Sequence, residues 1–197
     1  MDNHNYAILI VDMLNDFFAK GVLKKLRPEL VRNINRLVGE SRRQGHPIIW
    51  IRQEVAPDLS DAPLLVRKKK IHTIIAGTPG CQLLPELDHQ PTDHEIIKKR
   101  QSAFFRTELD SLLSQLGSTH LVLGGIATHA CIRVTAIDAY QRDYEVLIPS
   151  ECVASPDREH HEISLRFLDE GLIAQVQPLD TILEELITSG PQQKAST

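Results

Sequence analysis

Short apolar runs alternate with helical patterns along almost the whole chain, and this alternation limits the possible folds more than any other feature. The first run, at positions 6–11, is apolar or aromatic throughout, as a strand buried on both faces must be. Leu30 and Ile34 then recur at helical spacing before the next run, at 47–51. We expect Pro28 near the first turn of this helix. Repeated units of this kind predict a mostly parallel sheet with helical crossovers.

Six strands are expected in all, and helices join most of them. The runs interpreted as strands lie at 6–11, 47–51, 95–97, 120–123, 144–148 and 174–176. Their order predicts an α/β fold, a three-layer α/β/α sandwich whose six-stranded, mostly parallel sheet is Rossmann-like and doubly wound. Residues 1–188 are expected to form one domain, and the polar tail at 189–197 is expected to be disordered.

A long stretch between Arg52 and His94 interrupts the pattern. It contains five prolines and the basic run at 67–70, and we expect it to form a loop. A loop of this length inside a compact domain usually has a functional role. The basic run either faces solvent or belongs to a segment that closes on an anionic substrate, and both interpretations stay open, as does the question of a lid.

Charge and cysteine content narrow the partners and the compartment. A net charge of −4 favours neither nucleic acid nor an anionic membrane as a partner, and no apolar run reaches the ~20 residues of a membrane span. The three cysteines, Cys81, Cys131 and Cys152, are too widely spaced for a disulfide framework or a pair of zinc ligands. We therefore expect reduced thiols in a cytoplasmic protein, with Cys81 and Cys152 inert.

Three residues able to do chemistry follow predicted strands: Asp12, Lys98 and Cys131. Each has an ordinary interpretation, since Asp12 is placed to cap a turn, Lys98 is one of three consecutive cations, and Cys131 resembles a small buried hydrophobe. The carboxyl ends of parallel strands, however, meet at one edge of the sheet, where ligands bind in open α/β folds. We therefore expect the three side chains to form one catalytic site.

The chemistry of this trio suits nucleophilic attack on a carbonyl carbon. The thiol of Cys131 gives its proton to Asp12, while the ammonium of Lys98 stabilises the thiolate and holds the carboxylate. The start of the following helix is also expected to lower the pKa of the thiol. The backbone N–H groups of Ala127 and Cys131 are candidates for an oxyanion hole, and water then hydrolyses the thioester.

Three segments of the chain resemble the isochorismatase-like hydrolases, a superfamily that includes nicotinamidases, N-carbamoylsarcosine amidases and ureide hydrolases. The segments are IVDMLNDF at 10–17, IIKKRQSAF at 96–104 and GIATHAC at 125–131. The resemblance covers about residues 6–185 and implies a six-stranded parallel sheet. It also implies that the three strand-end residues are the catalytic triad, that Lys98 rather than Lys99 is the catalytic lysine, and that the Ile126–Ala127 peptide bond is cis.

Two features of the sequence refine what the resemblance implies. Members that cleave the vinyl ether of isochorismate commonly lack the cysteine, so Cys131 favours amide chemistry. Nicotinamidases carry an Asp-x-His and a further histidine as metal ligands after the second strand, whereas residues 53–70 here contain no histidine. We therefore expect neither a metal nor another cofactor.

Four further residues are expected to line the substrate pocket. Phe17 follows the first strand and suits either an apolar wall of the pocket or the core. Arg52 ends the second strand on the catalytic face and suits a substrate carboxylate or ureido oxygen. Thr128 and His129 precede the nucleophile, and for His129 we favour a pocket-lining or packing role over that of a base. The histidine pair at 160–161 is expected to face solvent.

The sequence therefore predicts a cysteine hydrolase that cleaves the C–N bond of a small amide, ureide or carbamoyl compound through a thioester. A vinyl ether hydrolase and a non-catalytic binding module on the same scaffold are the alternatives. Because members of the family commonly associate, the resemblance implies a homodimer or a homotetramer. Which compound is the substrate stays open.

Overall fold

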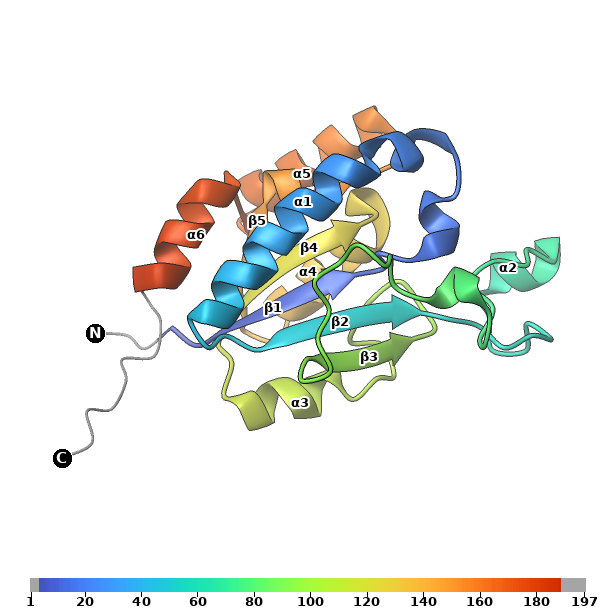
Figure 1. Cartoon of the computed structure of the whole chain (residues 1–197), viewed down its shortest axis with the longest axis horizontal. Helices are drawn as coiled ribbons and strands as arrows, with labels where there is room; N and C mark the ends of the chain where they lie inside the picture. Colours follow the sequence, from blue (N-terminus) through green and yellow to red (C-terminus); the bar gives the residue numbers. More distant parts are fainter. Residues whose placement is uncertain (1–3, 189–197) are drawn as a thin grey trace.

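In the described part of the chain, seven strands form the sheet, and all of them pair in parallel. The computed structural model describes residues 4–188, and the tail predicted at 189–197 lies outside them. The strands are β1 (Tyr6–Val11), β2 (Ile48–Gln53), β3 (His94–Lys98), β4 (His120–Ile126), β5 (Glu145–Pro149), β6 (Val153–Ala154) and β7 (Gln175–Gln177). Their order is β3-β2-β1-β4-β5-β7, of which β1 to β5 are labelled in Figure 1, and β6 pairs with the end of β4. The predicted α/β fold is confirmed, and β6 escapes prediction because two residues carry no readable pattern.

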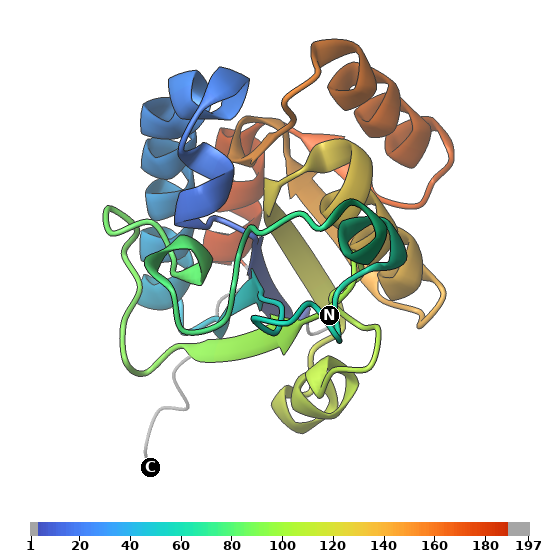
Figure 2. The same ribbon diagram turned by 90° about the vertical axis from the view of Figure 1, so that its right-hand side faces the viewer.

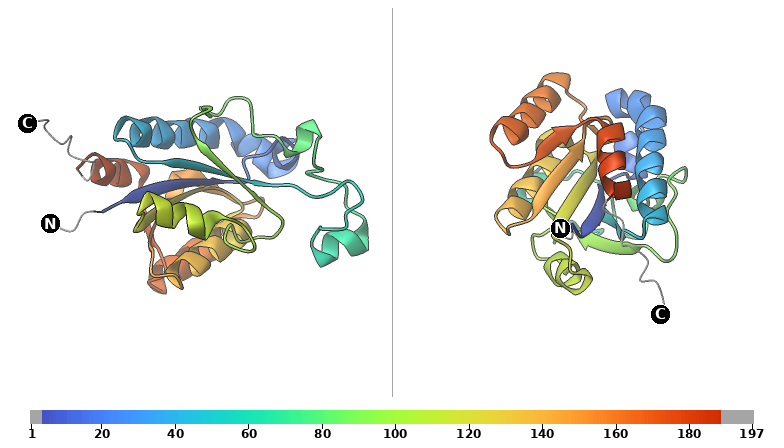
Figure 3. Two further views of the ribbon diagram at one scale, coloured as in Figure 1. Left: turned by 90° about the horizontal axis from the view of Figure 1, so that it is seen from below. Right: turned by 90° about the vertical axis from the view of Figure 1, so that its left-hand side faces the viewer.

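Helices cover both faces of this sheet (Figures 1 and 3). They are α1 (Gly21–Arg43), α3 (Leu109–Leu116), α4 (Arg133–Tyr140), α5 (Arg158–Glu170) and α6 (Leu179–Thr188), whereas the short helix α2 (Leu64–Lys69) lies beyond the ends of the strands. Ile8 and Ile10 of β1 pack with α1 and α6, whereas Leu9 and Val11 pack with α3, α4 and α5 on the opposite face. Neighbouring residues of β1 thus enter two different cores, which is why this strand is apolar at every position. None of the helices between residues 4 and 188 combines the length and hydropathy of a membrane span.

The first long helix begins earlier than the sequence pattern indicates. α1 starts at Gly21, so Pro28 lies inside the helix rather than near its first turn. Gly21 has a φ of +73°, a conformation that glycine adopts readily. Of the helical residues before Pro28, Leu23 alone is buried, so the apolar periodicity that would reveal the true start is weak there.

The stretch between β2 and β3 extends beyond the carboxyl ends of the strands (Figures 1 and 2). It contains α2, which the sequence pattern does not reveal because none of the residues of this helix is buried. The side chains of the basic run at 67–70 are all exposed, which favours the solvated interpretation of that run. Asp16, just after β1, anchors the returning chain, since its Oδ2 accepts a hydrogen bond from the Ile74 N–H at 2.6 Å.

β1 and β4 lie side by side at the centre of the sheet, and the helices that follow them cover opposite faces. This is the switch point at which open α/β sheets bind ligands. The register there pairs Val11 with Gly125, whose φ is +110°. A Cβ at position 125 would lie 2.0 Å from the Val11 carbonyl oxygen, so this approach of the two strands requires glycine.

Candidate active site

The structure brings Asp12, Lys98 and Cys131 together at the carboxyl edge of the sheet. Lys98 Nζ lies 2.7 Å from Asp12 Oδ2 and 3.3 Å from Cys131 Sγ. The side chain of Lys98 is 0% exposed and that of Asp12 is 1% exposed, and Cys131 is also buried. The trio is therefore almost completely shielded from bulk solvent. Charges in such a buried site interact more strongly than they do in water.

The ammonium of Lys98 has further acceptors close to it. Besides Asp12 and Cys131, it donates to the Arg100 carbonyl at 3.0 Å and to Gln53 Oε1 at 3.2 Å. Gln53 is the residue of β2 that pairs with Lys98, so the lysine side chain crosses the end of β2 to reach β1. Sequence reasoning assigned Gln53 no role, although its position at the end of a neighbouring strand was an available signal.

Backbone geometry fixes the Asp12 carboxylate. The Asp12 N–H donates to the Ile51 carbonyl at 2.8 Å, and Asp12 has a φ of +55°, which is uncommon for a residue other than glycine. Within residues 4–188, neither carboxylate oxygen accepts a hydrogen bond of good geometry, so the contact with Lys98 is an ion pair. A buried carboxylate with free lone pairs is well placed to accept a proton.

Cys131 lies in a tight turn between β4 and α4. The Ile126–Ala127 peptide bond is cis, and Thr128–Ile132 form a single turn of π-helix. The carbonyl of Ala127 accepts hydrogen bonds from the Ala130 and Ile132 N–H groups, at 2.9 and 3.2 Å. We call residues 126–132 the nucleophile turn, because this segment carries the predicted nucleophile, Cys131, together with both backbone N–H candidates for an oxyanion hole.

The electrostatics of the site keep the thiol neutral at rest. Burial and the Asp12 carboxylate raise the pKa of Cys131 to about 12, although Lys98 acts in the opposite direction. Burial alone would lower the pKa of Lys98, but Asp12 and Cys131 outweigh burial and raise it. The expectation that the helix start lowers the thiol pKa is therefore wrong for the resting site. Desolvation outweighs a helix-terminus effect that is typically worth only about 1 kcal/mol.

Phe17 and Arg52, the predicted pocket residues from the first half of the chain, are both partly buried. Phe17 lies in η1 (Asn15–Phe18) and packs against Ile74 and Cys81. The guanidinium of Arg52 already has partners, since Nε donates to Glu95 at 2.8 Å and Nη1 donates to the Cys81 carbonyl at 3.0 Å. To bind a substrate anion, Arg52 would have to leave these partners.

Thr128 contacts the first turn of α5, and His129 contacts the segment that joins β6 to α5. The Thr128 hydroxyl oxygen lies 2.9 Å from His161 Nδ1, and His129 Nδ1 lies 2.9 Å from the Ser155 hydroxyl oxygen. The expectation that the pair at 160–161 faces solvent is wrong for His161, which contacts the buried Thr128. No sequence motif marks Ser155 or His161, because their role depends on a contact between distant segments.

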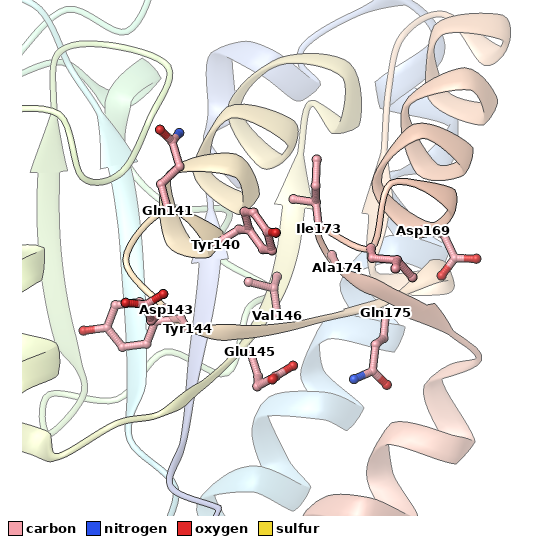
Figure 4. A pocket seen from close by; sticks show the side chains of 11 residues that line it. Tyr140, Gln141, Asp143, Tyr144, Glu145, Val146, Asp169, Ile173, Ala174 and Gln175 are labelled. Carbon is pink, nitrogen blue, oxygen red and sulfur yellow. The ribbon is translucent and has the colours of Figure 1, made fainter.

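Two of the surface hollows, both outside the predicted triad, are large. One, of about 610 Å³, is between the first turns of α1 and the start of α5, and Ser155 and His161 are part of its wall. The other, of about 770 Å³, is at the amino ends of β5 and β7, where Tyr140 and Glu145 line it (Figure 4). The first hollow therefore adjoins the nucleophile turn, and the second is at the opposite edge of the sheet.

Acidic side chains near the triad are engaged by cations. Lys99 Nζ lies 3.1 Å from Asp61 Oδ2 and 3.8 Å from Glu54 Oε1. Arg100 donates to the Asp61 carbonyl at 2.7 Å. In the part of the chain that the structure describes, no group of three or more histidine, cysteine or acidic side chains is arranged to hold a metal ion.

Comparison with known proteins places this geometry in one family. A model of the isochorismatase domain matches residues 6–179. An uncharacterized isochorismatase family protein of Bacillus subtilis, YaaI, is 32% identical over 187 residues, which are 94% of this chain and all of that relative. A probable inactive nicotinamidase of Arabidopsis thaliana is 34% identical over 169 residues, 82% of this chain and 86% of the relative. The crystal structure of a pyrazinamidase/nicotinamidase of Streptococcus mutans has a TM-score of 0.79 and 26% identity, and the match covers 87% of this chain and 99% of that one.

Proposed function

Because the chain belongs to the isochorismatase family, we propose that it is a cysteine hydrolase that cleaves the C–N bond of a small amide, ureide or carbamoyl compound. The observation that carries this proposal is the contact of Lys98 with both Asp12 and Cys131 in one buried site. The likeness to a pyrazinamidase/nicotinamidase supports an amide as the class of substrate.

The first half of the reaction forms a thioester. Asp12 accepts the thiol proton while Cys131 Sγ bonds to the carbonyl carbon, and the electron pair of the C=O bond moves to oxygen. The N–H groups of Ala127 and Cys131 are the proposed donors to this oxyanion. The C–N bond then breaks, and the leaving nitrogen takes the proton from Asp12. Because the resting thiol is neutral, Asp12 has to take its proton before or during the attack.

The second half returns the site to its starting state. Water gives a proton to Asp12 and its oxygen bonds to the thioester carbon, so that the C–S bond breaks and Cys131 recovers the proton. The products are an amine or ammonia and a carboxylic or carbamic acid. Lys98 stays protonated throughout, since its pKa is raised, and its charge offsets the negative charge that passes between Asp12 and Cys131.

A vinyl ether hydrolase and a non-catalytic binding module are the alternatives. The relative from Arabidopsis, named as a probable inactive nicotinamidase, keeps the second alternative in view. Against it stands the burial of the trio, because a buried ion pair such as Asp12 with Lys98 contributes little net stability and is more readily explained by catalysis.

An ammonia-release screen tests the proposed function. The panel is nicotinamide, carbamoyl amino acids, biuret, ureidoacrylate and maleamate, with isochorismate as the ether substrate. We expect ammonia from at least one nitrogen compound and no cleavage of isochorismate. Cleavage of isochorismate alone would support the ether hydrolase, and no turnover of any compound would support the binding module.

We also propose that the chain acts as a homodimer or a homotetramer with a small-molecule substrate. Exposed large apolar side chains support association, among them Leu64 and Leu65 on α2 and Phe167 on α5. Sedimentation equilibrium measures the molecular mass directly, and a monomer at micromolar concentrations would contradict this proposal.

A further inference from the structure

The nucleophile turn is held from outside by two hydrogen-bonded contacts. Thr128 Oγ1 lies 2.9 Å from His161 Nδ1. The Ser155 hydroxyl oxygen lies 2.9 Å from His129 Nδ1 and accepts a hydrogen bond from the His129 N–H at 3.3 Å. Thr128 and His129 are consecutive and directly follow Ala127. Their partners lie outside the triad. Ser155 directly follows β6, and His161 lies in the first turn of α5.

We infer that His161 is a positioning residue for the proposed reaction, which acts through Thr128 to hold the nucleophile turn in its reactive geometry. Ser155 makes the second contact, with His129, and we call the two contacts together the clamp. The inference rests on the proposed function for its effect on turnover, but its effect on the reactivity of Cys131 does not require a known substrate.

Burial makes the contact between Thr128 and His161 hard to replace. Thr128 is 0% exposed, and a buried hydroxyl without a partner costs about 1–3 kcal/mol. Among the described residues, His161 supplies the one side-chain group within hydrogen-bonding distance of this hydroxyl. If His161 is removed, the free energy of the turn falls when the hydroxyl moves towards another partner.

The chemistry of the two groups fits a fixed orientation. Burial lowers the pKa of His161, although the neighbouring Glu162 opposes the shift, so the imidazole is neutral at pH 7. A neutral imidazole has one donor and one acceptor nitrogen, and a hydroxyl can both donate and accept, so either tautomer allows a hydrogen bond between Nδ1 and the Thr128 hydroxyl. The hydroxyl therefore points out of the turn and towards α5.

The space behind His161 allows the turn to move when the imidazole is lost. His161 is part of the wall of the hollow of about 610 Å³, with Leu26 of α1 on the other side. An open hollow supplies no new wall for the turn, so the Thr128 hydroxyl regains a partner by moving towards the water there. Loss of the imidazole is therefore expected to loosen the turn instead of causing a compensating repacking.

Loosening the turn has opposite effects on two measurements. Turnover falls, because Cys131 and the oxyanion donors leave their relative positions, and a displacement of 1 Å can cost about 100-fold. Alkylation of Cys131 by iodoacetamide accelerates, because burial is the main reason that the thiol has a raised pKa and is inaccessible. Global unfolding would also raise alkylation, but it would lower the thermal unfolding midpoint as well. Faster alkylation with an unchanged midpoint therefore indicates a local change at the turn.

Three variants separate these possibilities. His161→Ala removes the contact, and His161→Asn places an amide oxygen near the position of Nδ1 and should restore it. Glu159→Ala is the matched control, since Glu159 lies two residues before His161 in the same helix and is exposed. Thr128→Val removes the same hydrogen bond from its other end, so its effects and those of His161→Ala should not add.

The experiment measures alkylation of Cys131 by peptide mapping, together with kcat on any substrate that the screen identifies. We expect His161→Ala to raise the alkylation rate several-fold and to lower kcat about 10- to 100-fold, with His161→Asn and Glu159→Ala close to the parent protein. Equal alkylation rates in His161→Ala and Glu159→Ala would overturn the inference. If alkylation rises as expected but no amide is hydrolysed by any variant, the clamp stands and the proposed function fails.

Discussion

Lys98 Nζ lies 2.7 Å from Asp12 Oδ2 although their strands, β3 and β1, are separated by β2. The lysine side chain spans the end of the intervening strand, where Gln53 Oε1 lies 3.2 Å from the ammonium. Through the ion pair with Asp12 and the hydrogen bond to Gln53, the ammonium of Lys98 thus joins three neighbouring strands at the carboxyl edge of the sheet. The same ammonium contacts the Cys131 sulfur, so the positions of the proposed base and nucleophile depend on each other.

Replacing Asp12 should damage both activity and stability. Asp12→Asn removes the proposed base and should lower kcat by about 10²- to 10⁴-fold. It also leaves the buried ammonium of Lys98 without its counter-charge, which should cost about 3–5 kcal/mol in the free energy of unfolding. Ammonia release and urea denaturation measure the two effects.

An exposed ion pair provides the matched control for this variant. Glu86 pairs with Arg27 at 2.6 Å, with 52% of the Glu86 side chain exposed. Glu86→Gln should cost at most about 1 kcal/mol, because water screens the pair. If Asp12→Asn cost no more than Glu86→Gln, the pairing of Asp12 with Lys98 would have no special importance.

The pH dependence of alkylation reports the resting state of the nucleophile. Because the pKa of Cys131 is raised to about 12, the thiolate fraction at neutral pH is small and grows as pH rises. The alkylation rate of Cys131 should therefore increase about tenfold per pH unit from pH 7 to pH 9, without a plateau. Peptide mapping, with Cys131→Ser as the blank, distinguishes this thiol from Cys81 and Cys152. A plateau near neutral pH would show a preformed thiolate and contradict the neutral resting thiol.

Gly125 should tolerate no side chain. A Cβ there would meet the Val11 carbonyl oxygen at 2.0 Å, and the φ of +110° is strained for any other residue. Gly125→Ala should lower the free energy of unfolding by about 2–4 kcal/mol. Gly39→Ala is the control, because nothing lies within 4 Å of a Cβ at this helical position and the change should stabilise by about 0.5–1 kcal/mol. Equal midpoints of denaturation for the two variants would refute the close strand contact.

The fold and the trio could be predicted because their signals are local. Each position of β1 is apolar since the two faces of the strand enter two cores, and this pattern is visible without any other part of the chain. Asp12 and Lys98 lie at strand ends, which the topology of parallel sheets brings to one edge. Their juxtaposition therefore needed no knowledge of side-chain packing.

The remaining features depend on contacts between distant segments. α2 has no buried residue, so no apolar period marks it, and β6 is defined by its pairing with β4. The contact of His161 with Thr128 joins α5 to the nucleophile turn, and a sequence gives no measure of that distance. The raised pKa of Cys131 reverses the expectation from the helix start because it depends on burial, which the complete fold determines.

The central claim is that Cys131 is the nucleophile in hydrolysis of a C–N bond. Its most direct test compares ammonia release by the parent protein with that by Cys131→Ala and Cys152→Ala on the best substrate of the screen. Both cysteines are buried, but Cys152 belongs to the core cluster on the α1 side of the sheet. We predict a loss of at least about 10³-fold for Cys131→Ala, with each variant still folded, and a much smaller effect for Cys152→Ala. Undiminished ammonia release by folded Cys131→Ala would contradict the proposed mechanism.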